Sequence, residues 1–405
     1  MKIVFASHSY FSPVFVVGSH HLARAAARSK HLVWHLSSAL SIAHLPFALI
    51  RKEYRQRARI CFSGRRIEAG LSEGVPLTLM PWAAVRRAAQ PENWYLPPRR
   101  LIERWAKRHQ FTSPDLLLID EPRMAALIPA LNPRIVIYRP TDIYSVLKDD
   151  ETIQGVERRL LARADAVVGT SQAVLSHVCD HQPAKPTLLL ENGVDLEHFA
   201  EARPEPRDIA EIPRPRAIYV GAIDQRFDLA LLDTAAKANP GIHFVIIGGF
   251  PQQADFASGV PRNLIFLGPK PYTEIPAYLQ HADFAVMPLK SNVANDARSP
   301  MKLYEFSAAG LPVLSTSTSE LRRRALPHVF LADTPQEFAA LSAQIAVMGR
   351  DRMERSARSC ADTNGWPAKW KQLLDFALSV KGHHLAPNHG VPRFDYTSTA
   401  LKPEL

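Results

Sequence analysis

The sequence predicts an α/β protein made of two doubly wound domains, and three observations lead to this fold class. Short apolar segments alternate with helical segments along most of the chain, which is typical of parallel sheets covered by helices. The length of 405 residues is sufficient for two such domains. A charged, proline-rich stretch at residues 201–216 lies near the middle of the chain and has the composition of a linker.

The domain boundaries follow from these features. We expect an N-terminal domain, a linker, a C-terminal domain, a final amphipathic helix and an irregular tail, at residues 1–200, 201–216, 217–365, 366–380 and 381–405. The tail contains His, Pro and Gly without hydrophobic periodicity, so we expect no regular structure there.

The first element is a short apolar strand at residues 2–6, followed by a loop at 7–13 and a helix at 20–27. In doubly wound sheets ligands bind at the carboxyl ends of the strands, where this loop lies. His8 and His20 are therefore candidates for contact with a substrate. The alternative is that both histidines only cap the helix or pack against it.

The alternation resumes in the second part of this domain. Strands are expected at residues 115–120, 134–139 and 166–171, and helices at 124–128, 157–164 and 172–176. The run at residues 188–195 closes this half with its last strand and a turn. Asp120 and Glu121 end the first of these strands, and Asp142 follows the second. These carboxylates stand at the sheet edge where ligands bind, although an Asp after a strand also commonly caps a helix.

Residues 51–109 interrupt the alternation with clustered basic residues and interleaved aromatic ones. The aromatic residues are Trp82, Trp94, Tyr95 and Trp105. The whole chain has a formal net charge of +10 and a pI of about 9.6, which favours anionic partners. This combination suits an anionic membrane surface. The alternatives are single-stranded nucleic acid or a solvated basic face with the aromatic residues in the core. Because no nucleic-acid-binding motif occurs, we expect no nucleic acid partner.

Composition and motifs argue against several other classes. The sequence begins with a strand rather than an apolar leader, and its longest apolar run, residues 42–50, is too short to span a bilayer. The three cysteines are far apart, which indicates a reducing, cytoplasmic compartment. No Gly-x-Gly-x-x-Gly follows the first strand, which argues against a dinucleotide-dependent oxidoreductase.

The second half contains a series of strands that each end at a glycine or proline. They are expected at residues 217–222, 242–249, 263–268 and 283–288, with helices that begin at Phe227 and Tyr272. Gly221, Gly248 and Gly249 lie in these exits, where small residues let a diphosphate approach the backbone. A single glycine turn is a weak signal, since every α/β sheet has some.

The stretch at residues 299–315 carries the most specific pattern, a loop, a helix, a glycine stop at Gly310 and a short buried strand. Lys302 and Glu305 are three residues apart and therefore share one face of this helix. The start of a helix attracts anions, and a lysine placed there against the helix dipole indicates an anionic partner such as a diphosphate. The alternative is a buried crossover helix with an incidental surface lysine.

This stretch resembles the nucleotide-sugar helix of two-domain glycosyltransferases with the GT-B fold. In that family a Glu five residues before a Gly-x-Pro-Val turn binds the ribose hydroxyls, and Glu305 with residues 310–313 has this spacing. Retaining enzymes usually carry a second Glu eight residues earlier, where this chain has Ala297 beside Asp296. The Ser-x-Met-Lys-Leu run at 299–303 is similar to that of the xanthan-pathway glucuronosyltransferase (GumK-like) family, which inverts configuration.

The resemblance implies two Rossmann-like domains that face each other across a cleft, with the last helix crossing back to the N-terminal domain. It implies donor-binding roles for Gly221, Arg226, Gly248, Gly249, Met301, Lys302 and Glu305. The run at residues 138–142 resembles the segment that carries the catalytic Asp in the xanthan-pathway family, so Asp142 is expected to be the catalytic base. The acceptor-side candidates at the same sheet edge are His8, His20, Asp120 and Glu121. The two carboxylates are also rival bases, as are Asp149, Asp150 and Glu151.

The function implied by the resemblance is inverting transfer of a sugar from a nucleotide-diphosphate donor, a UDP-sugar such as UDP-glucuronate. The expected acceptor is a polyprenyl-diphosphate-linked saccharide of surface polysaccharide synthesis, met at the inner face of the cell membrane. No cofactor or metal is expected, because no Asp-x-Asp occurs and the GT-B type neutralises the leaving diphosphate with helix N–H groups and cations. The alternatives are a nucleotide-sugar epimerase of the same shape and a non-catalytic binding protein of polysaccharide assembly.

Overall fold

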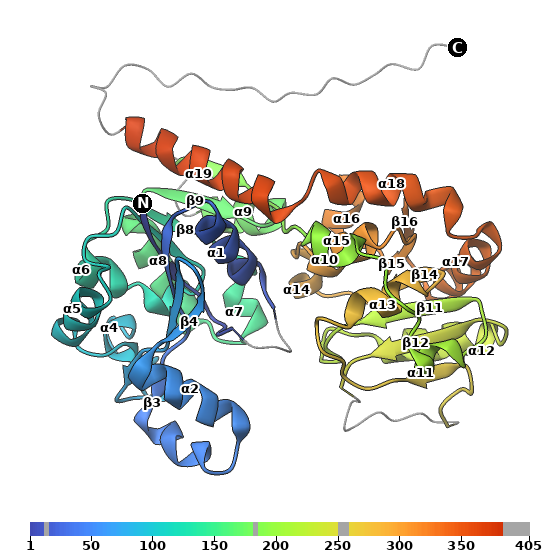
Figure 1. The fold of residues 1–405 in the computed structure, drawn as a ribbon, viewed down its shortest axis with the longest axis horizontal. Helices are drawn as coiled ribbons and strands as arrows, with labels where there is room; N and C mark the ends of the chain where they lie inside the picture. The colour runs from blue at the N-terminus through green and yellow to red at the C-terminus, as the bar shows by residue number, and fades with distance from the viewer. Residues whose placement is uncertain (12–15, 181–184, 250–258, 384–405) are drawn as a thin grey trace.

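The computed structural model describes residues 1–11, 16–180, 185–249 and 259–383, and it shows two α/β domains side by side (Figure 1). Each domain is built on a largely parallel sheet that carries helices, which confirms the predicted fold class. Successive side chains of the first strand belong to different hydrophobic clusters. Ile3 and Phe5 lie in one cluster, and Val4 and Ala6 lie in another. Both faces of the sheet are therefore covered, as expected for parallel strands.

The N-terminal domain contains an eight-stranded sheet in the order β10-β9-β8-β7-β1-β2-β5-β4. Its strands are β1 (Lys2–Ala6), β2 (Leu32–Leu36), β4 (Arg65–Glu68), β5 (Leu71–Gly74), β7 (Leu116–Ile119), β8 (Val136–Tyr138), β9 (Ala166–Gly169) and β10 (Thr187–Leu189). All neighbours pair in parallel except β4 and β5, which are antiparallel. The carboxyl ends of β1, β7, β8, β9 and β10 therefore lie along one edge of this sheet.

The helices of this domain differ in length and in how deeply they are buried. They are α1 (Gly18–Arg28), η1 (Ile42–Ala48), α2 (Lys52–Ser63), α3 (Trp82–Val85), α4 (Glu92–Tyr95), α5 (Arg99–Arg108), η2 (Pro122–Met124), α6 (Leu127–Leu131), α7 (Tyr144–Leu147), α8 (Thr152–Arg163) and α9 (Gln172–Cys179). A small parallel pair, β3 (Leu40–Ser41) and β6 (Leu77–Thr78), lies beside η1 and α2. We call residues 40–63 the tip, because they form the far end of the N-terminal domain (Figure 1).

Most of the aromatic residues in the basic region serve the core. The ring centroids of Trp105 and Trp34 are 4.6 Å apart, and Tyr95 is buried under the same hydrophobic cluster. Trp82 packs partly buried against this cluster, whereas Trp94 is 61% exposed. Three of the four aromatic residues thus pack in or against the core, as the alternative interpretation of this region predicted. Among the described residues, none of the helices combines the length and the apolar content that a bilayer crossing requires.

The C-terminal domain contains a six-stranded parallel sheet in the order β13-β12-β11-β14-β15-β16. Its strands are β11 (Arg216–Val220), β12 (His243–Ile247), β13 (Leu264–Phe266), β14 (Phe284–Met287), β15 (Val313–Thr316) and β16 (Val329–Ala332). The helices after β11 are α12 (Leu229–Ala238), α13 (Ile275–Gln280), α14 (Val293–Asp296), α15 (Met301–Ala308), α16 (Ser319–Arg324), α17 (Pro335–Met348) and α18 (Asp351–Asp362). The strands expected from the sequence occur close to their expected places.

The segment 299–315 folds as the sequence predicts. Helix α15 begins after Pro300, and Gly310 follows its end with a φ of +75°, a left-handed conformation that glycine adopts without strain. The chain then enters β15, which lies buried between β14 and β16. The start of α15 is thereby placed at the carboxyl edge of this sheet.

The stretch expected to be a linker is packed against the C-terminal domain. It contains α11 (Arg207–Ala210), and the preceding α10 (Leu196–Ala200) also belongs to this part of the chain. Phe199, Ile209 and Ile212 are buried in the same hydrophobic cluster as β11 and α15. These buried apolar side chains anchor the segment that was predicted to be a linker from its charged, proline-rich composition.

The final helix, α19 (Trp366–His383), crosses back to the N-terminal domain and lies along α1 (Figure 1). Trp366 stacks on His21 with ring centroids 5.1 Å apart and an interplanar angle of 5°. Trp370 and Leu373 are buried in the N-terminal core. This helix confirms the predicted crossover and packs against α1 of the N-terminal domain.

Candidate active site at the domain junction

Three consecutive residues of the C-terminal domain meet three strand exits of the N-terminal domain. The hydroxyl of Ser171, after β9, donates a hydrogen bond to the carbonyl oxygen of Ala297. The Nε atom of Arg298 lies 2.9 Å from Oδ1 of Asp142, after β8. Asn192, after β10, donates from its side chain to the carbonyl oxygen of Ser299 at 2.7 Å. The carboxyl edges of the two sheets thus meet at the loop that leads into α15.

Asp142, the predicted base, lies at this junction and is 9% exposed. Its Oδ2 atom accepts a hydrogen bond from the hydroxyl of Thr141 at 3.1 Å. Its Oδ1 atom has the ion pair with Arg298, but among the described residues no group hydrogen-bonds this oxygen. The neighbouring helix α7 has Ile143 at its N-cap and no side-chain cap. The structure therefore does not use Asp142 as a helix cap, and its catalytic role remains a prediction.

The two rival carboxylates are each held by cations. Asp120 forms a buried, two-bond pair with Arg139, at 2.9 and 2.6 Å. Glu121 pairs with Arg123 at 2.6 Å and with Lys148 at 2.9 Å. Burial alone would raise the pKa of Glu121, but the charges of Lys148 and Arg123 hold it well below its ordinary value. Both carboxylates are therefore parts of buried ion-pair networks.

The two histidine candidates differ in position. His8, after β1, lies within electrostatic range of Glu121, Asp120 and Asp142, and burial lowers its pKa below the ordinary value of 6.5 although these acids oppose the shift. It is thus at the junction edge and neutral at pH 7. His20 is fully buried, stacks on Phe11 with centroids 4.2 Å apart, and burial lowers its pKa to about 3. His20 follows the packing alternative.

Helix α15 presents the predicted donor-binding pair. The Nζ atom of Lys302 lies 2.8 Å from Oε2 of Glu305, whose side chain is 3% exposed. No side chain among the described residues caps the start of this helix, so its first N–H groups are not covered by a capping oxygen. Met301 packs against the hydrophobic cluster shared by β1 and α19. The start of α15 is therefore positioned by both domains.

The exits of β11 and β12 approach each other closely. A Cβ atom on Gly248 would lie 2.2 Å from the carbonyl oxygen of Gly221, so this position requires glycine. At Gly249 a Cβ would meet nothing within 4 Å, and the chain then enters residues 250–258, which lie outside the described part. Arg226, in the exit of β11, pairs with Asp224 at 2.5 Å.

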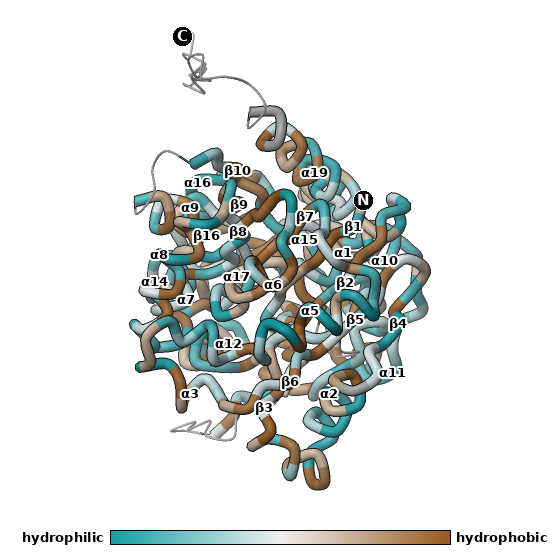
Figure 2. Tube along the Cα trace, turned by 90° about the vertical axis from the view of Figure 1, so that its left-hand side faces the viewer, coloured by the Kyte–Doolittle hydropathy of each residue, from teal (hydrophilic) through white to brown (hydrophobic). Residues whose placement is uncertain are grey.

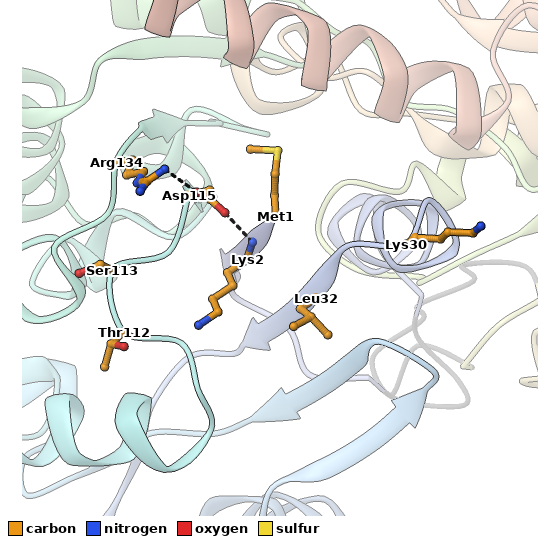
Figure 3. A pocket seen from close by; sticks show the side chains of 8 residues that line it. All are labelled: Met1, Lys2, Lys30, Leu32, Thr112, Ser113, Asp115 and Arg134. Carbon is orange, nitrogen blue, oxygen red and sulfur yellow. Dashed lines mark hydrogen bonds and ion pairs between the residues drawn. The ribbon is translucent and has the colours of Figure 1, made fainter.

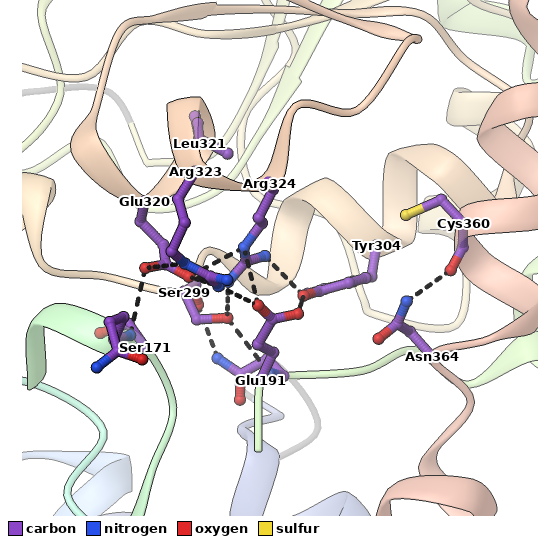
Figure 4. Close-up of polar contacts among 12 residues, drawn as sticks. Ser171, Glu191, Ser299, Tyr304, Glu320, Leu321, Arg323, Arg324, Cys360 and Asn364 are labelled. Atoms are coloured by element: carbon purple, nitrogen blue, oxygen red, sulfur yellow. Dashed lines mark hydrogen bonds and ion pairs between the residues drawn. The ribbon is translucent and has the colours of Figure 1, made fainter. Parts of the chain in front are cut away.

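A polar cluster beside this site was not anticipated from the sequence (Figure 4). Glu191, after β10, accepts from Tyr304 of α15 at 3.1 Å and pairs with Arg323 and Arg324 of α16. Arg324 also donates to the hydroxyl of Ser299 at 2.9 Å. We call Glu191, Ser299, Tyr304, Glu320, Arg323 and Arg324 the clamp, because they join the last exit of the N-terminal sheet to α15 and α16.

A shallow depression of about 470 Å³ lies at the opposite, amino edge of the N-terminal sheet (Figure 3). It is lined by Met1, Lys2, Lys30, Leu32, Thr112, Ser113, Asp115 and Arg134. None of the predicted site residues lines it. The site at the domain junction and this depression are therefore separate features.

Comparison with known proteins agrees with this geometry. Residues 214–346 match the family model described as "Glycosyl transferases group 1". The structure is similar over 95% of this chain and all of the other to sucrose-phosphate synthase from Thermosynechococcus elongatus, with a TM-score of 0.70 and 16% identity. The chain has the GT-B fold. Its C-terminal domain carries the group 1 glycosyltransferase match, and the carboxyl edges of two facing sheets are where such folds bind ligands.

Other GT-B structures and two curated sequences are also similar. Anabaena HepE in complex with UDP-glucose matches 94% of this chain and 100% of that chain, with a TM-score of 0.65 and 16% identity. A putative teichuronic acid biosynthesis glycosyltransferase, TuaH, of Bacillus subtilis is 27% identical over 56% of this chain, and the match covers 60% of TuaH. The UDP-glucuronate:glycolipid 2-beta-glucuronosyltransferase of Xanthomonas campestris is 24% identical over 55% of this chain and 53% of its own length. The match thus spans little more than half of these two relatives.

Proposed function

We propose that this protein transfers a sugar from a nucleoside diphosphate donor to a saccharide acceptor, with inversion of configuration and with Asp142 as the base. The observation that carries the proposal is the placement of Asp142 at the junction beside the loop that opens α15, with Arg298 only 2.9 Å from the carboxylate. The loop that leads to the proposed donor-binding residues and the proposed base thus come from different domains and meet at the Arg298–Asp142 pair. A transferase needs this arrangement, because donor and acceptor must react side by side.

On the donor side, the start of α15 offers uncapped N–H groups and the cation of Lys302, which suit a diphosphate. Glu305, held by Lys302 at 2.8 Å, has a second oxygen that can accept ribose hydroxyls. UDP is the favoured nucleotide, since HepE was solved with UDP-glucose and a curated relative uses UDP-glucuronate. UDP-glucuronate is one candidate donor, and the positive charges of Arg226 and Arg298 near the site are compatible with it.

In the proposed step the acceptor hydroxyl oxygen attacks C1 of the donor sugar and a new C–O bond forms. The bond from C1 to the diphosphate breaks, its electron pair leaves with the diphosphate, and the hydroxyl proton passes to Asp142. Lys302 and the N–H groups of α15 stabilise the leaving charge without a metal. Ala297 stands where retaining enzymes have a Glu, and the adjacent Asp296 is occupied with Ser319 at 2.6 Å, which supports inversion.

The acceptor is proposed to be a polyprenyl-diphosphate-linked saccharide at the inner face of the cell membrane. The tip supports this, because Leu49 and Ile50 are 81% and 82% exposed and Phe47 is 45% exposed. Apolar residues of the tip appear in brown at the lower end of the molecule (Figure 2). Arg51 and Lys52 follow directly, so apolar and cationic groups are adjacent, as in proteins that dock on anionic bilayers.

The test is incubation of the purified protein with a panel of labelled UDP-sugars, with and without a polyprenyl-diphosphate-linked saccharide, followed by product identification. Transfer to the lipid-linked saccharide, or release of UDP and free sugar from one donor, supports the proposal. An epimerised sugar nucleotide would instead support the epimerase alternative. Binding of a sugar nucleotide without any turnover would favour a non-catalytic role.

A further inference from the structure

Arg298 lies between the predicted base Asp142 and the start of α15, and the function proposed above gives it no role in the reaction. Its backbone is held on both sides, because Ala297 accepts a hydrogen bond from Ser171 and Ser299 bonds to Asn192. Its side chain is 34% exposed and ends at the carboxylate of Asp142. A long side chain on a fixed backbone can change its partner without any movement of the domains.

The contact with Asp142 is close but poorly aligned. The Nε atom of Arg298 is 2.9 Å from Oδ1 of Asp142, and yet within the described chain this oxygen has no partner with hydrogen-bond geometry. By contrast, Arg139 donates two hydrogen bonds with good geometry to Asp120 at the same sheet edge, and both of these side chains are 2% exposed. The Arg298 pair is therefore the more readily broken of the two.

Arg298 also faces the donor side of the junction. Burial would raise the pKa of Asp224, but hydrogen bonds from Arg226 and the charges of Arg226 and Arg298 keep it below the ordinary value. Arg298 is thus within electrostatic range of the β11 exit loop, which the sequence associates with the donor. It also lies four residues before Lys302, in the loop that leads to the start of α15.

We propose that Arg298 is a positioning residue that exchanges partners during the reaction. Before a donor binds, Arg298 covers Asp142 and balances its negative charge. When a donor enters, the guanidinium moves to the donor's diphosphate and leaves the carboxylate free to accept the acceptor's proton. Donor binding and exposure of the base are then one event, so an acceptor meets an active base only when donor is present. This inference rests on the proposed function, since it needs a nucleoside diphosphate at α15.

The exchange is favourable on charge alone. A diphosphate carries more negative charge than one carboxylate and offers a guanidinium two oxygens on each phosphate. The partly exposed pair with Asp142 opposes the exchange only weakly, because such pairs contribute little in water. Removing the charge of Asp142 should therefore free Arg298 to bind the donor and raise the donor affinity. Removing Arg298 should lower the donor affinity, because the diphosphate loses one of its cationic partners.

The experiment measures UDP affinity by calorimetry for the wild type, Asp142→Asn, Arg298→Gln and the double variant. Asp142→Asn should bind UDP about 2–5-fold more tightly, the range of one partly exposed ion pair, and Arg298→Gln about 10–150-fold more weakly, the range of one charged hydrogen bond. The double variant should bind as weakly as Arg298→Gln. The control is Lys237→Gln, which removes a positive charge of the same domain from the surface pair with Asp233 and should leave the affinity unchanged.

The expected changes in UDP affinity have opposite signs for the two single variants, and this distinguishes an exchange of partners from a purely structural ion pair. If the pair only held the domains together, both single variants would break the same contact and shift the affinity in the same direction, which would overturn the inference. A gain from Asp142→Asn that persists in the Arg298→Gln background would also overturn it. A wild-type protein that binds none of UDP, GDP, ADP and TDP would contradict the proposed function itself, and the inference with it.

Discussion

The Nζ atom of Lys302 lies 2.8 Å from the Oε2 atom of Glu305 on one face of α15, and the two side chains differ in exposure. The side chain of Lys302 is 32% exposed and that of Glu305 is 3% exposed. The lysine can therefore hold the buried carboxylate and also reach a ligand. Two roles, one for the diphosphate and one for the nucleoside, can be separated by mutation.

Lys302→Ala is expected to weaken UDP binding by about 1.5–3 kcal/mol, because a charged hydrogen bond to the diphosphate is lost. Calorimetry measures the change, and Lys237→Ala on α12 is the matched control. The thermal unfolding midpoint must be recorded for both, since loss of Lys302 also leaves Glu305 without its partner. Unchanged UDP affinity in a folded Lys302→Ala protein would exclude the diphosphate role.

Glu305→Ala is expected to reduce the affinity for UDP while the affinity for inorganic pyrophosphate stays the same or rises. The reason is that the carboxylate binds ribose hydroxyls, which pyrophosphate lacks, and its removal also frees Lys302. Competition of each ligand against a labelled UDP-sugar checks this. An equal loss for pyrophosphate and UDP would show that Glu305 acts through Lys302 only.

The tip is expected to bind vesicles that contain anionic lipid, with affinity that falls as salt rises. Replacing Leu49 and Ile50 together by Ser should lower binding at low salt, because two side chains that are 81% and 82% exposed lose their apolar contact with lipid. Neutralising Arg99, Arg100 and Arg104 together should lower binding further and flatten the salt dependence.

The control for the apolar pair is Val347→Ser on α17, at a side chain that is 89% exposed in the other domain. Vesicle sedimentation should not distinguish this control from the wild type. Sedimentation that responds neither to salt nor to the tip substitutions would favour the solvated basic face instead.

Glu191→Gln is expected to destabilise the protein by about 1.5–3 kcal/mol at pH 7, because the clamp loses the charged hydrogen bond that Arg323 donates to Glu191 and the ion pair of Glu191 with Arg324. Burial would raise the pKa of Glu191, but the two arginines hold it below the ordinary value of 4.5. A lowered pKa in the folded state adds stability above pH 4.5 that is lost as the pH falls through the lowered value.

The difference in unfolding midpoint between wild type and Glu191→Gln should therefore be largest near pH 7 and shrink below about pH 4.5. Glu103→Gln, in the exposed pair with Arg99, is the control and should change the midpoint little at any pH. A difference that stays constant from pH 7 to pH 4 would mean that Glu191 stabilises the fold without its charge.

Much of the architecture could be predicted because local patterns carry it. The buried strands are short apolar runs between turn residues, and the glycine after α15 marks its end by chain geometry alone. Strand β2 and the packing of residues 201–216 were not predicted, because their local sequences resemble other kinds of structure. Strand β2 contains His35, whose burial depends on neighbouring residues, and Ile209 anchors a segment that looks like a linker by composition.

The site was predictable only in its parts. Lys302 and Glu305 are neighbours in sequence, so their pairing follows from helix spacing. The contacts between Asp142 and Arg298, and between Glu191 and Arg324, join residues of different domains. No periodicity or spacing encodes such contacts, because they depend on how the two sheets meet. The pairing of Asp120 with Arg139 was likewise visible only in the structure, because the two residues are 19 positions apart in the sequence.

The most direct test of the whole account is the turnover of Asp142→Asn with the donor and lipid-linked acceptor found in the substrate panel. Asparagine keeps the size and polarity of the side chain but cannot accept the acceptor's proton. The account predicts a folded protein that binds UDP at least as well as the wild type and turns over about 10²–10⁴-fold more slowly. Near-normal turnover would contradict it, return Asp142 to a structural role and move the search for the base to Asp120 and Glu121.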